Sequence, residues 1–571
     1  MPILTALLDG CYNVFVVRPA RGQSGPADVG CQRRVGLSAG SATSSTVGAK
    51  SQNNRYWENA GAEKTRGSVY TPPRIAAALV RWAVRSASNH VLDPACGDGV
   101  FLAAGRTRLA DLGSRNPYCN GVDIDPTAAA ASGGVCDDFF RWVRSAPQYD
   151  AVVGNPPFVR SHLFPEESRK LAFQQMVGLG LRPSRLMSTW LPFIALSSGI
   201  LSETGRLAFV APEELLQVNY AEELRRFLLS RFRRVIVCVP NADLFPSVQQ
   251  SVVLLLCDND WVGPGGLLSM RFQHLEEGPP YYVERAEPWD WSRKWTHLFL
   301  DRRQRKLVDD CFAGLPWKRM EDYGRVEVGV VTGDNKFFIV DERIARSIGE
   351  QYVTPIVSGA RDLRGIRFAP DEFRSLVQEG KPAFLINTSE REDCLPRALQ
   401  EYLAEGRRVG IHTRYKCRNR QPWYAVPSVR PADAVLLRQA GQVPRLVQVD
   451  GRLTSTDTVH RVTWEQPRMG KRHAVGFLNT LTLLACELTG RSYGGGVLEL
   501  MPREASRLPM PPPSDKLEQA FDKADDLVRR RAFDDVIQLV DCIVAPPCTA
   551  RPLVTDARDV LWKLIERRKT K

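Results

Sequence analysis

The sequence has no uninterrupted run of about 18 apolar residues, which a membrane-spanning helix requires. Its first residues, Met-Pro-Ile-Leu-Thr, also lack the charged leader and apolar block of a signal peptide. The 13 cysteines are scattered singly without a Cys-x-x-Cys pair, and the 7 histidines show no metal-ligand spacing. We therefore expect a soluble, cytoplasmic protein without a zinc ribbon, a disulfide framework or another metal site.

An excess of basic residues is the first positive feature. The 77 lysines and arginines outnumber the 64 acidic residues, which gives a formal net charge of +13. This excess favours a polyanionic partner such as nucleic acid, although charge alone leaves an anionic membrane or simple solubility open. At 571 residues the chain is too long for one compact core, and domains of roughly 100–200 residues predict two or three of them.

The most informative stretch is residues 150–158, Asp-Ala-Val-Val-Gly-Asn-Pro-Pro-Phe. Val152 and Val153 suit a buried parallel strand, while a glycine and two prolines stop the strand and fix φ over the next residues. Asn155 and Phe158 are therefore held at the carboxyl end of a strand, where ligands bind in open α/β sheets. Asn-Pro-Pro alone is a common turn, so the rest of the chain decides what it means.

Strand and helix patterns alternate around this stretch. Strands are expected over 90–93, 118–122, 150–153 and 206–210, and helices over 72–84, from Val100 onward, over 185–202 and over 212–230. Such alternation predicts a parallel sheet with helices on both faces. Strands 234–239 and 251–257 are joined by too few residues for a crossover helix, so we expect them to pair antiparallel.

These motifs resemble the S-adenosylmethionine-dependent amino-methyltransferases, and within them the gamma class of DNA adenine-N6 methyltransferases from restriction-modification systems. Residues 91–102 are similar to the cofactor motif, residues 121–126 to the ribose motif and residues 155–158 to the catalytic motif. The resemblance implies an α/β class I methyltransferase (Rossmann-like) fold. Its mostly parallel seven-stranded sheet has a terminal antiparallel strand, and an α+β target-recognition domain and a helical tail follow.

The resemblance also implies S-adenosylmethionine as the cofactor and assigns residues to it. They are Tyr70, Thr71, Asp93, Ala95, Gly97, Gly99, Asp123, Ile124, Asp138 and Phe139. Gly97 and Gly99 allow the backbone to approach the cofactor, and the next helix N-terminus favours its carboxylate. Asp123 ends a strand where an acid can bind both ribose hydroxyls. By resemblance Thr71 and Asp93 serve the methionine part, while Asp138 (or its neighbour Asp137) and Phe139 serve the adenine.

Chemistry at the turn follows from the nature of an adenine amine, whose lone pair is delocalised into the ring. The side-chain oxygen of Asn155 and the carbonyl of Pro156 could each accept one N–H, which favours a pyramidal nitrogen directed at the sulfonium methyl. No cysteine nucleophile is needed, so Cys96 is expected to be a small turn residue. A base in a duplex must be flipped out, and Phe158 offers one aromatic wall. The resemblance gives Phe245 as the other wall, but hairpin packing explains Phe245 equally well.

The second half carries three weaker similarities to the family's target-recognition region, at residues 328–339, 423–427 and 497–502. Between the first two, residues 407–420 interleave basic and aromatic side chains, which suits phosphate contact and the reading of guanine edges. Arg414, Lys416, Arg418 and Arg420 are the candidate DNA-contacting residues as a cluster. For any one of these arginines, a solvated surface is the simpler explanation.

Five parts are therefore expected along the chain. They are a flexible low-complexity leader (1–60), the methyltransferase domain (61–262), a connecting region (263–316), the DNA target-recognition domain (317–513) and a helical C-terminal segment (514–571). Double-stranded DNA is the expected partner, together with a cognate restriction endonuclease, and no membrane is expected.

Two alternatives stay open at this point. The first is an RNA or protein amino-methyltransferase, against which the long basic second half argues. The second is an inactive DNA-binding subunit with a methyltransferase fold, against which the intact set of Asp93, Asp123 and Asn155 argues.

Overall fold

The computed structural model describes residues 71–240, 251–260, 262–263, 265–279, 281–285, 294–493, 495–544 and 551–569. Contacts divide the chain into residues 1–58 and 59–571, and every element below belongs to the second unit. The expected leader, Tyr70 and Phe245 lie outside the described residues. Of the helices in the described part, none combines the length and the apolar character that crossing a membrane takes.

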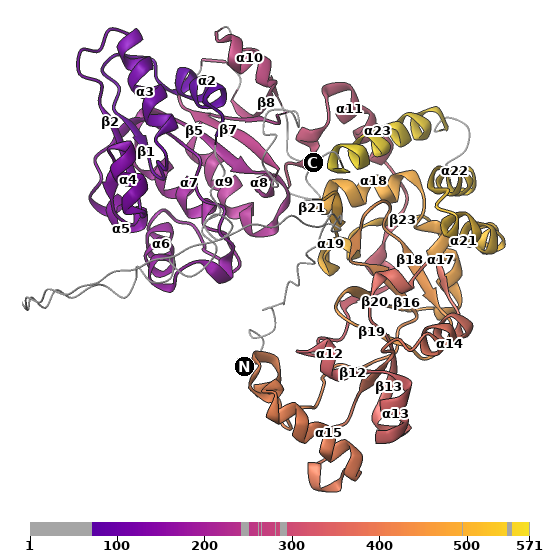
Figure 1. Cartoon of the computed structure of the whole chain (residues 1–571). Helices are drawn as coiled ribbons and strands as arrows, with labels where there is room; N and C mark the ends of the chain where they lie inside the picture. The colour runs from indigo at the N-terminus through magenta and orange to yellow at the C-terminus, as the bar shows by residue number, and fades with distance from the viewer. Residues whose placement is uncertain are drawn as a thin grey trace, which may run out of the picture. The chain divides into compact units, whose positions relative to one another are not determined.

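A nine-stranded sheet forms the first half, in the order β3-β2-β1-β4-β5-β7-β6-β8-β9 (Figure 1). Its strands are β1 (Val91–Asp93), β2 (Cys119–Asp123), β3 (Val135–Cys136), β4 (Tyr149–Gly154), β5 (Leu201–Pro212), β6 (Arg234–Cys238), β7 (Val252–Asp258), β8 (Gly266–Met270) and β9 (Glu284–Arg285). Neighbours from β3 to β5 pair parallel, and β7 is antiparallel to both β5 and β6. The predicted antiparallel pair is therefore confirmed.

Helices cover both faces of this sheet. They are α2 (Pro73–Ala83), α3 (Val100–Asp111), α4 (Pro126–Ser132), α5 (Phe139–Trp142), α6 (Glu166–Gly178), α7 (Trp190–Gly199), α8 (Glu214–Gln217), α9 (Glu222–Arg231) and α10 (Phe272–Glu277). Figure 1 shows α2 and α3 on one side of β5 and β7, with α7 and α9 on the other. The expected class I methyltransferase fold is thus present.

Three local expectations differ from the structure. The region expected to be a connection, 263–316, adds β8 and β9 to the sheet, which therefore has nine strands among the described residues instead of the expected seven. The antiparallel strand β7 accordingly lies inside the sheet, between β5 and β6, and not at its end. The helix expected over 185–202 is shorter, because the chain enters β5 at Leu201. The helix expected over 212–230 is split, because Val218 is extended, and the buried guanidinium of Arg225 donates to the carbonyls of Leu215 and Val218 at the break.

The second half combines several small sheets with helices, as an α+β architecture. Its strands are β10 (Lys318–Arg319), β11 (Gly324–Val328), β12 (Ile339–Val340), β13 (Val353–Val357), β14 (Arg367–Phe368), β15 (Phe384–Ile386), β16 (Ala434–Leu437), β17 (Gln439–Ala440), β18 (Leu446–Val449), β19 (Thr454–Ser455), β20 (Val459–Trp464), β21 (Arg491–Tyr493), β22 (Val497–Glu499) and β23 (Pro509–Met510). The largest sheet has the order β11-β20-β16-β18-β14, and a second has the order β12-β15-β13-β19.

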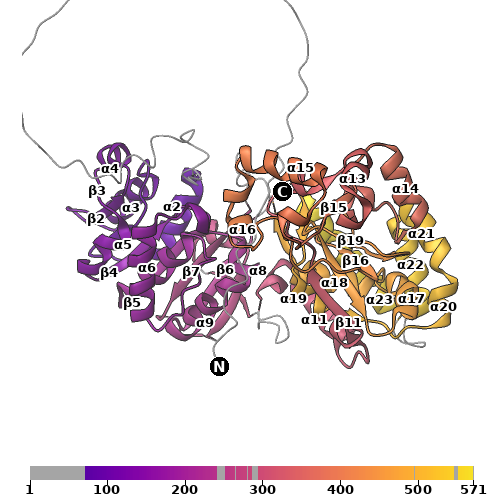
Figure 2. The same cartoon turned by 90° about the horizontal axis from the view of Figure 1, so that it is seen from below.

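Helices of this half fall into two groups. The first is α11 (Arg302–Phe312), α12 (Asn335–Phe338), α13 (Glu342–Ile348), α14 (Pro370–Gln378), α15 (Arg397–Arg408) and α16 (Tyr415–Arg418). Figure 2 shows α13 and α15 beside β15. The second is α17 (Gly470–Gly476), α18 (Thr480–Thr489), α19 (Pro502–Ser506), α20 (Asp515–Gln519), α21 (Phe521–Arg529), α22 (Phe533–Val544) and α23 (Arg551–Lys569). The last four form the helical tail and share one apolar core with α17, α18 and β16.

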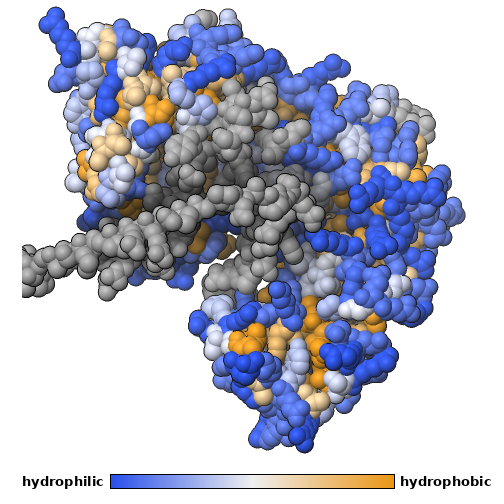
Figure 3. Space-filling view, viewed as in Figure 1, coloured by the Kyte–Doolittle hydropathy of each residue, from blue (hydrophilic) through white to orange (hydrophobic). Residues whose placement is uncertain are grey.

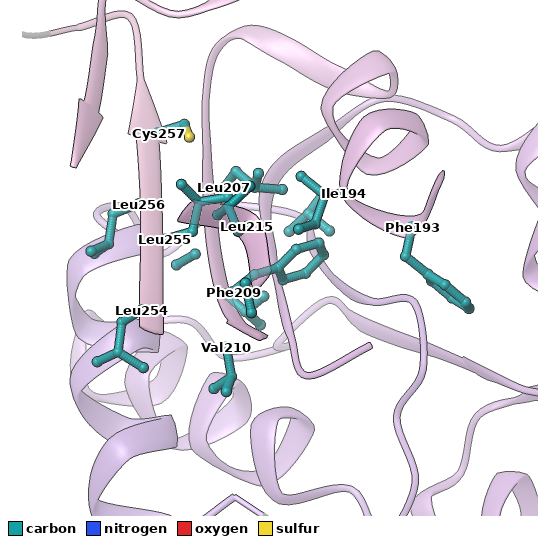
Figure 4. Close-up of a cluster of buried hydrophobic side chains, with 14 of the residues drawn as sticks. Phe193, Ile194, Leu207, Phe209, Val210, Leu215, Leu254, Leu255, Leu256 and Cys257 are labelled. Carbon is teal, nitrogen blue, oxygen red and sulfur yellow. The ribbon is translucent and has the colours of Figure 1, made fainter. Parts of the chain in front are cut away.

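The apolar core of the first half fills the space between sheet and helices. Figure 4 shows Ile194 of α7 directed toward Leu207 of β5 and Leu215, while Phe193 points away from them. The face drawn in Figure 3 is mostly hydrophilic, with apolar residues in scattered patches. The predicted strands and helices thus bury their apolar side chains, as expected. The polar ends of the strands lie together at one edge of the sheet.

Candidate active site

Three parallel strands bring the predicted polar residues to one edge of the sheet. β1 lies between β2 and β4 and ends at Asp93, β2 ends at Asp123, and β4 ends at Gly154, next to Asn155. Carboxyl ends of neighbouring parallel strands meet at the same edge, where the βα loops form a crevice. Residues far apart in sequence therefore become neighbours here.

Asp93 is the most deeply buried of these residues, with 1% of its surface exposed. Its Oδ1 accepts from the backbone N–H of Ala95 at 3.1 Å. A Cβ added to Gly154 would meet Oδ1 of Asp93 at 2.6 Å, so only glycine fits at this point of β4. Burial, with a smaller contribution from Asp123, raises the pKa of Asp93 to about 8.

The glycine turn after β1 joins the two acidic strand ends. The N–H of Gly97 donates to Oδ2 of Asp123 at 2.9 Å, and the N–H of Asp125 donates to its Oδ1 at 2.9 Å. Gly97 and Gly99 have φ of +49° and +83°, a region that favours glycine, and Gly99 precedes α3 as its N-cap. A Cβ at Gly97 would meet no atom within 4 Å, so open space faces this backbone.

Cys96 serves packing, as expected. Its Sγ lies 3.2 Å from Oγ of Ser132, and any Cβ on Gly121 or Gly134 would collide with it. Burial and the charge of Asp93 raise the pKa of the Cys96 thiol to about 12. A thiol with that pKa is protonated at neutral pH and is a poor nucleophile.

The groups that line the space beside this turn are of the kinds that S-adenosylmethionine needs. Ile124 follows Asp123 and is 47% exposed, an apolar surface next to an acid that can bind hydroxyls. The open backbone at Gly97 and the N-terminus of the 12-residue helix α3 complete a lining with amide donors. Apolar, acidic and amide groups together match the adenine, ribose and carboxylate of that cofactor.

The predicted adenine-side residues, Asp138 and Phe139, are more enclosed. Asp138 caps α5, with Oδ1 accepting from the N–H of Phe140 at 2.9 Å and Oδ2 accepting from the hydroxyl of Ser168. Phe139 is 3% exposed and stacks on Phe193, with ring centroids 4.9 Å apart. Ser168 of α6 is a partner that no sequence pattern indicated, because the contact spans 30 residues.

The catalytic turn is held from two sides by threonine hydroxyls. Nδ2 of Asn155 donates to Oγ1 of Thr71 at 3.1 Å. On the other side, the hydroxyl of Thr189 donates to the carbonyl of Pro157 and accepts from the N–H of Val159 at 3.0 Å. Sequence reasoning missed both contacts, since each joins the turn to a residue at least 30 positions away. The neighbouring Phe158 is 7% exposed and belongs to the core.

The candidate DNA-contacting residues separate into two kinds. Tyr415 is 53% exposed, and its ring carries Lys416 Nζ at 5.6 Å and Arg418 Cζ at 5.3 Å from the centroid. Arg414 forms an ion pair with Asp334. Arg420 instead donates to the backbone carbonyls of Thr332 and Val331, both at 2.8 Å. The structure thus joins the basic stretch 407–420 to the family-similar stretch 328–339, with Arg420 as the link.

Comparison with known families decides what this arrangement is. Residues 55–132 match the family model described as N-6 DNA Methylase, and residues 121–245 match the Eco57I restriction-modification methylase. Residues 292–545 match the C-terminal domain of the type II methyltransferase M.Eco57I. Taken together, these matches support a site-specific DNA adenine-N6 methyltransferase of a restriction-modification system. The DNA methyltransferase therefore uses S-adenosylmethionine and methylates N6 of adenine at specific sites.

Individual relatives agree with this assignment. The methyltransferase is 21% identical over 483 residues to type II methyltransferase M.AccI of Acinetobacter calcoaceticus, covering 78% of this chain and 85% of the relative. It is 24% identical over 486 residues to M.XamI of Xanthomonas campestris pv. amaranthicola, with the same coverage. The type IIL restriction-modification enzyme MmeI, solved in complex with DNA, shares the fold with a TM-score of 0.53 at 12% identity, over 86% of this chain and 75% of that one.

No cluster of three or more His, Cys, Asp or Glu side chains suited to a metal ion occurs in the part of the chain that the structure describes.

Proposed function

We propose that Asn155 and Pro156 bind the exocyclic amine of an adenine flipped out of duplex DNA and hold it for in-line methyl transfer. The observation that carries this proposal is the contact between Asn155 and Thr71. Because Nδ2 donates to Oγ1 of Thr71, the amide presents Oδ1 on its opposite side. Oδ1 is an acceptor and suits an amine N–H, whereas Nδ2 would repel it.

Residues of this chain act by positioning and electrostatics. Oδ1 of Asn155 and the carbonyl of Pro156 each accept one N–H, so the nitrogen lone pair becomes localised and directed along one line. When bound, the cofactor would supply an electrophilic methyl on its sulfonium. As the N–C bond forms and the bond from the methyl to sulfur breaks, positive charge grows on the amine, and the two oxygens stabilise it. The methylated amine then releases one proton to water. No protein side chain forms a covalent bond.

The Thr189 contacts make this geometry rigid. Pro156 and Pro157 have fixed φ, and Thr189 bonds the chain on both sides of Phe158, through Pro157 and Val159. A turn that is ordered before substrate arrives loses little entropy when the base binds. Phe158 lies within this braced turn, where its ring offsets part of the stacking that the base loses on leaving the duplex.

Cofactor roles follow the same edge of the sheet. Asp123 would bind the ribose hydroxyls, with Ile124 against the adenine, and Asp93 and Thr71 would lie toward the methionine end. Ala95, Gly97 and Gly99 would approach through their backbone. The amine of the cofactor's adenine would be bound by Asp138, with Phe139 beside the ring. Arg414, Lys416 and Arg418 would contact phosphates, while Arg420 would shape the loop that carries them.

Double-stranded DNA is the proposed partner in solution, and a restriction endonuclease of the same specificity the proposed companion in the cell. The names of the relatives support the second proposal, because M.AccI and M.XamI are type II methyltransferases. The test is to sequence modified bases in DNA from cells that express the protein. We expect N6-methyladenine in one sequence context. Treatment with the purified protein should then protect DNA that contains this sequence from the companion endonuclease. Methyl groups on cytosine, on RNA or on protein alone would overturn the proposal.

A further inference from the structure

Two segments beside the catalytic turn carry basic side chains that neither the cofactor nor the target amine uses. The first is residues 160–163, Arg-Ser-His-Leu, which follows the turn directly and contains the short helix η3 (Ser161–Leu163). The second is residues 182–186, Arg-Pro-Ser-Arg-Leu, which precedes Thr189. Arg160, Arg182 and Arg185 are exposed. We call these two segments the catalytic rim.

Thr189 fastens the two segments of the catalytic rim to the turn. Its N–H donates to the carbonyl of Val159 at 3.0 Å, and its hydroxyl contacts Pro157 and Val159. Each segment also has a buried anchor nearby, Phe164 at 4% exposure and Met187 at 1%. Arg160 thus follows Asn155 by five residues, and Arg185 precedes by four residues the Thr189 that bonds the turn.

The three arginines of the catalytic rim differ from other exposed arginines of this half. Arg85 pairs with Asp260, Arg141 with Asp137 and Arg226 with Glu222. Among the residues that the structure describes, no carboxylate lies within 4 Å of a nitrogen of the three rim arginines. Glu166, the acid that follows the first segment most closely, is already held by Arg169 and Lys170.

Each segment of the catalytic rim also carries an exposed apolar side chain. Leu163 is 46% exposed and Leu186 is 48% exposed, one in each segment of the catalytic rim. Exposed arginines with exposed apolar neighbours match a nucleic-acid strand, which presents phosphates on one side and sugar and base surface on the other. An acidic protein surface would offer less apolar area and no regular spacing of charge.

We propose that the catalytic rim binds the DNA strand on both sides of the extruded adenine. Arg160, Arg182 and Arg185 contact its flanking phosphates, and Leu163 and Leu186 cover sugar and base surface that extrusion exposes. This inference rests on the proposed function. It assigns strand binding at the point of chemistry to the methyltransferase half, apart from the basic cluster at Tyr415.

A matched pair of triple variants tests the rim. The rim variant carries Arg160→Ala, Arg182→Ala and Arg185→Ala. The control carries Arg115→Ala, Arg144→Ala and Arg233→Ala, three exposed arginines that precede β2, β4 and β6 at the opposite edge of the sheet. Both variants lose three positive charges, so net charge alone affects them equally.

Binding of a random-sequence duplex is measured by fluorescence anisotropy at about 50 to 200 mM salt. Each lost phosphate contact lowers the magnitude of the slope of log affinity against log salt by about 0.9. The slope should therefore fall by up to about 2.7 in the rim variant and by almost nothing in the control. Equal slopes for the two variants would overturn the proposal. Cofactor binding, measured by calorimetry, should match the wild type in both.

A second measurement locates the contact. Unmethylated duplexes that contain the protein's target sequence are made with neutral methylphosphonate linkages on both sides of the target adenine. The wild type should bind these duplexes more weakly than ordinary ones. The rim variant should bind both kinds of duplex equally, because it lacks the arginines that contact those phosphates. Additive losses would overturn the assignment. A wild type that binds duplex but methylates no adenine would overturn the proposed function instead, and the salt comparison would still decide the rim.

Discussion

Nδ2 of Asn155 donates a hydrogen bond to Oγ1 of Thr71, 3.1 Å away and 84 residues earlier in the chain. Thr71 is 7% exposed, so the bond lies at the edge of the core, where water competes weakly. A carboxamide can turn over and exchange its oxygen for its nitrogen. The Thr71 hydroxyl is one group that fixes which end of Asn155 faces the target.

Replacing Thr71 tests this orientation. Thr71→Val keeps the shape but removes the acceptor, and a lost hydrogen bond of about 1–1.5 kcal/mol predicts a kcat lower by roughly 5–10-fold. Thr71→Ser should keep most of the activity. Orientation of Asn155 predicts an unchanged affinity for S-adenosylmethionine in Thr71→Val. A weaker affinity with unchanged kcat would assign Thr71 to the cofactor alone.

Thr189 should matter for both stability and rate. Thr189→Val leaves the carbonyl of Pro157 and the N–H of Val159 without their partner, which predicts a loss of about 1–3 kcal/mol in the free energy of unfolding. Displacement of the turn should lower kcat by on the order of 10–100-fold. Denaturant titration and single-turnover kinetics measure the two effects, and Thr189→Ser is the control. Wild-type rates in Thr189→Val would show that the turn needs no such brace.

Asp93 should make stability depend on pH. Burial raises its pKa in the folded protein to about 8, above the ordinary value of 3.8. The folded state therefore holds the proton more tightly, and this contribution is complete below pH of about 4 and is lost as the pH rises to about 8. Asp93→Asn stays neutral, so its stability relative to the wild type should increase across that range while cofactor binding weakens.

Chemical unfolding at several pH values checks the Asp93 prediction. Asp98→Asn is a suitable control, because Asp98 lies in the same turn but is exposed. It should change neither the pH dependence nor cofactor affinity by much. A constant difference between Asp93→Asn and the wild type from pH 4 to 8 would show that Asp93 is ionised in the folded protein.

The cluster at Tyr415 should separate into binding and structural residues. Lys416→Ala together with Arg418→Ala should reduce the salt slope of DNA binding by about 1.8, at unchanged stability. Arg420→Ala should instead lower the free energy of unfolding by about 1–3 kcal/mol, since it leaves the carbonyls of Val331 and Thr332 without a donor. An Arg420→Ala protein of normal stability that binds DNA weakly would reverse this division.

The strand ends could be predicted from sequence because they follow from local pattern and one topological rule. Apolar strands that end at Asp93, Asp123 and Gly154, with helices between them, place their carboxyl ends together wherever the sheet is parallel. The antiparallel pair β6 and β7 followed in the same way, from a connection too short for a crossover.

Contacts made by single hydroxyls could not be predicted. Thr71, Ser168 and Thr189 each bond a group at least 30 residues away, and nothing in their own neighbourhood marks a threonine or serine as a partner of a distant carbonyl, amide or carboxylate. The break at Val218 escaped for a similar reason. The amphipathic pattern continues through it, and the buried Arg225 that satisfies the freed carbonyls lies on the next helix.

Single-turnover methyl transfer by Asn155→Ala tests the central claim most directly. The variant should still melt at the wild-type temperature and bind S-adenosylmethionine and duplex DNA with wild-type affinity, since the side chain of Asn155 lies at the end of β4, outside the apolar core, and bonds the hydroxyl of Thr71 there. Its rate of methyl transfer to the target sequence should fall by about 10²–10³-fold or more, because an acceptor for the amine is gone. Undiminished methylation by a folded Asn155→Ala protein would contradict the account.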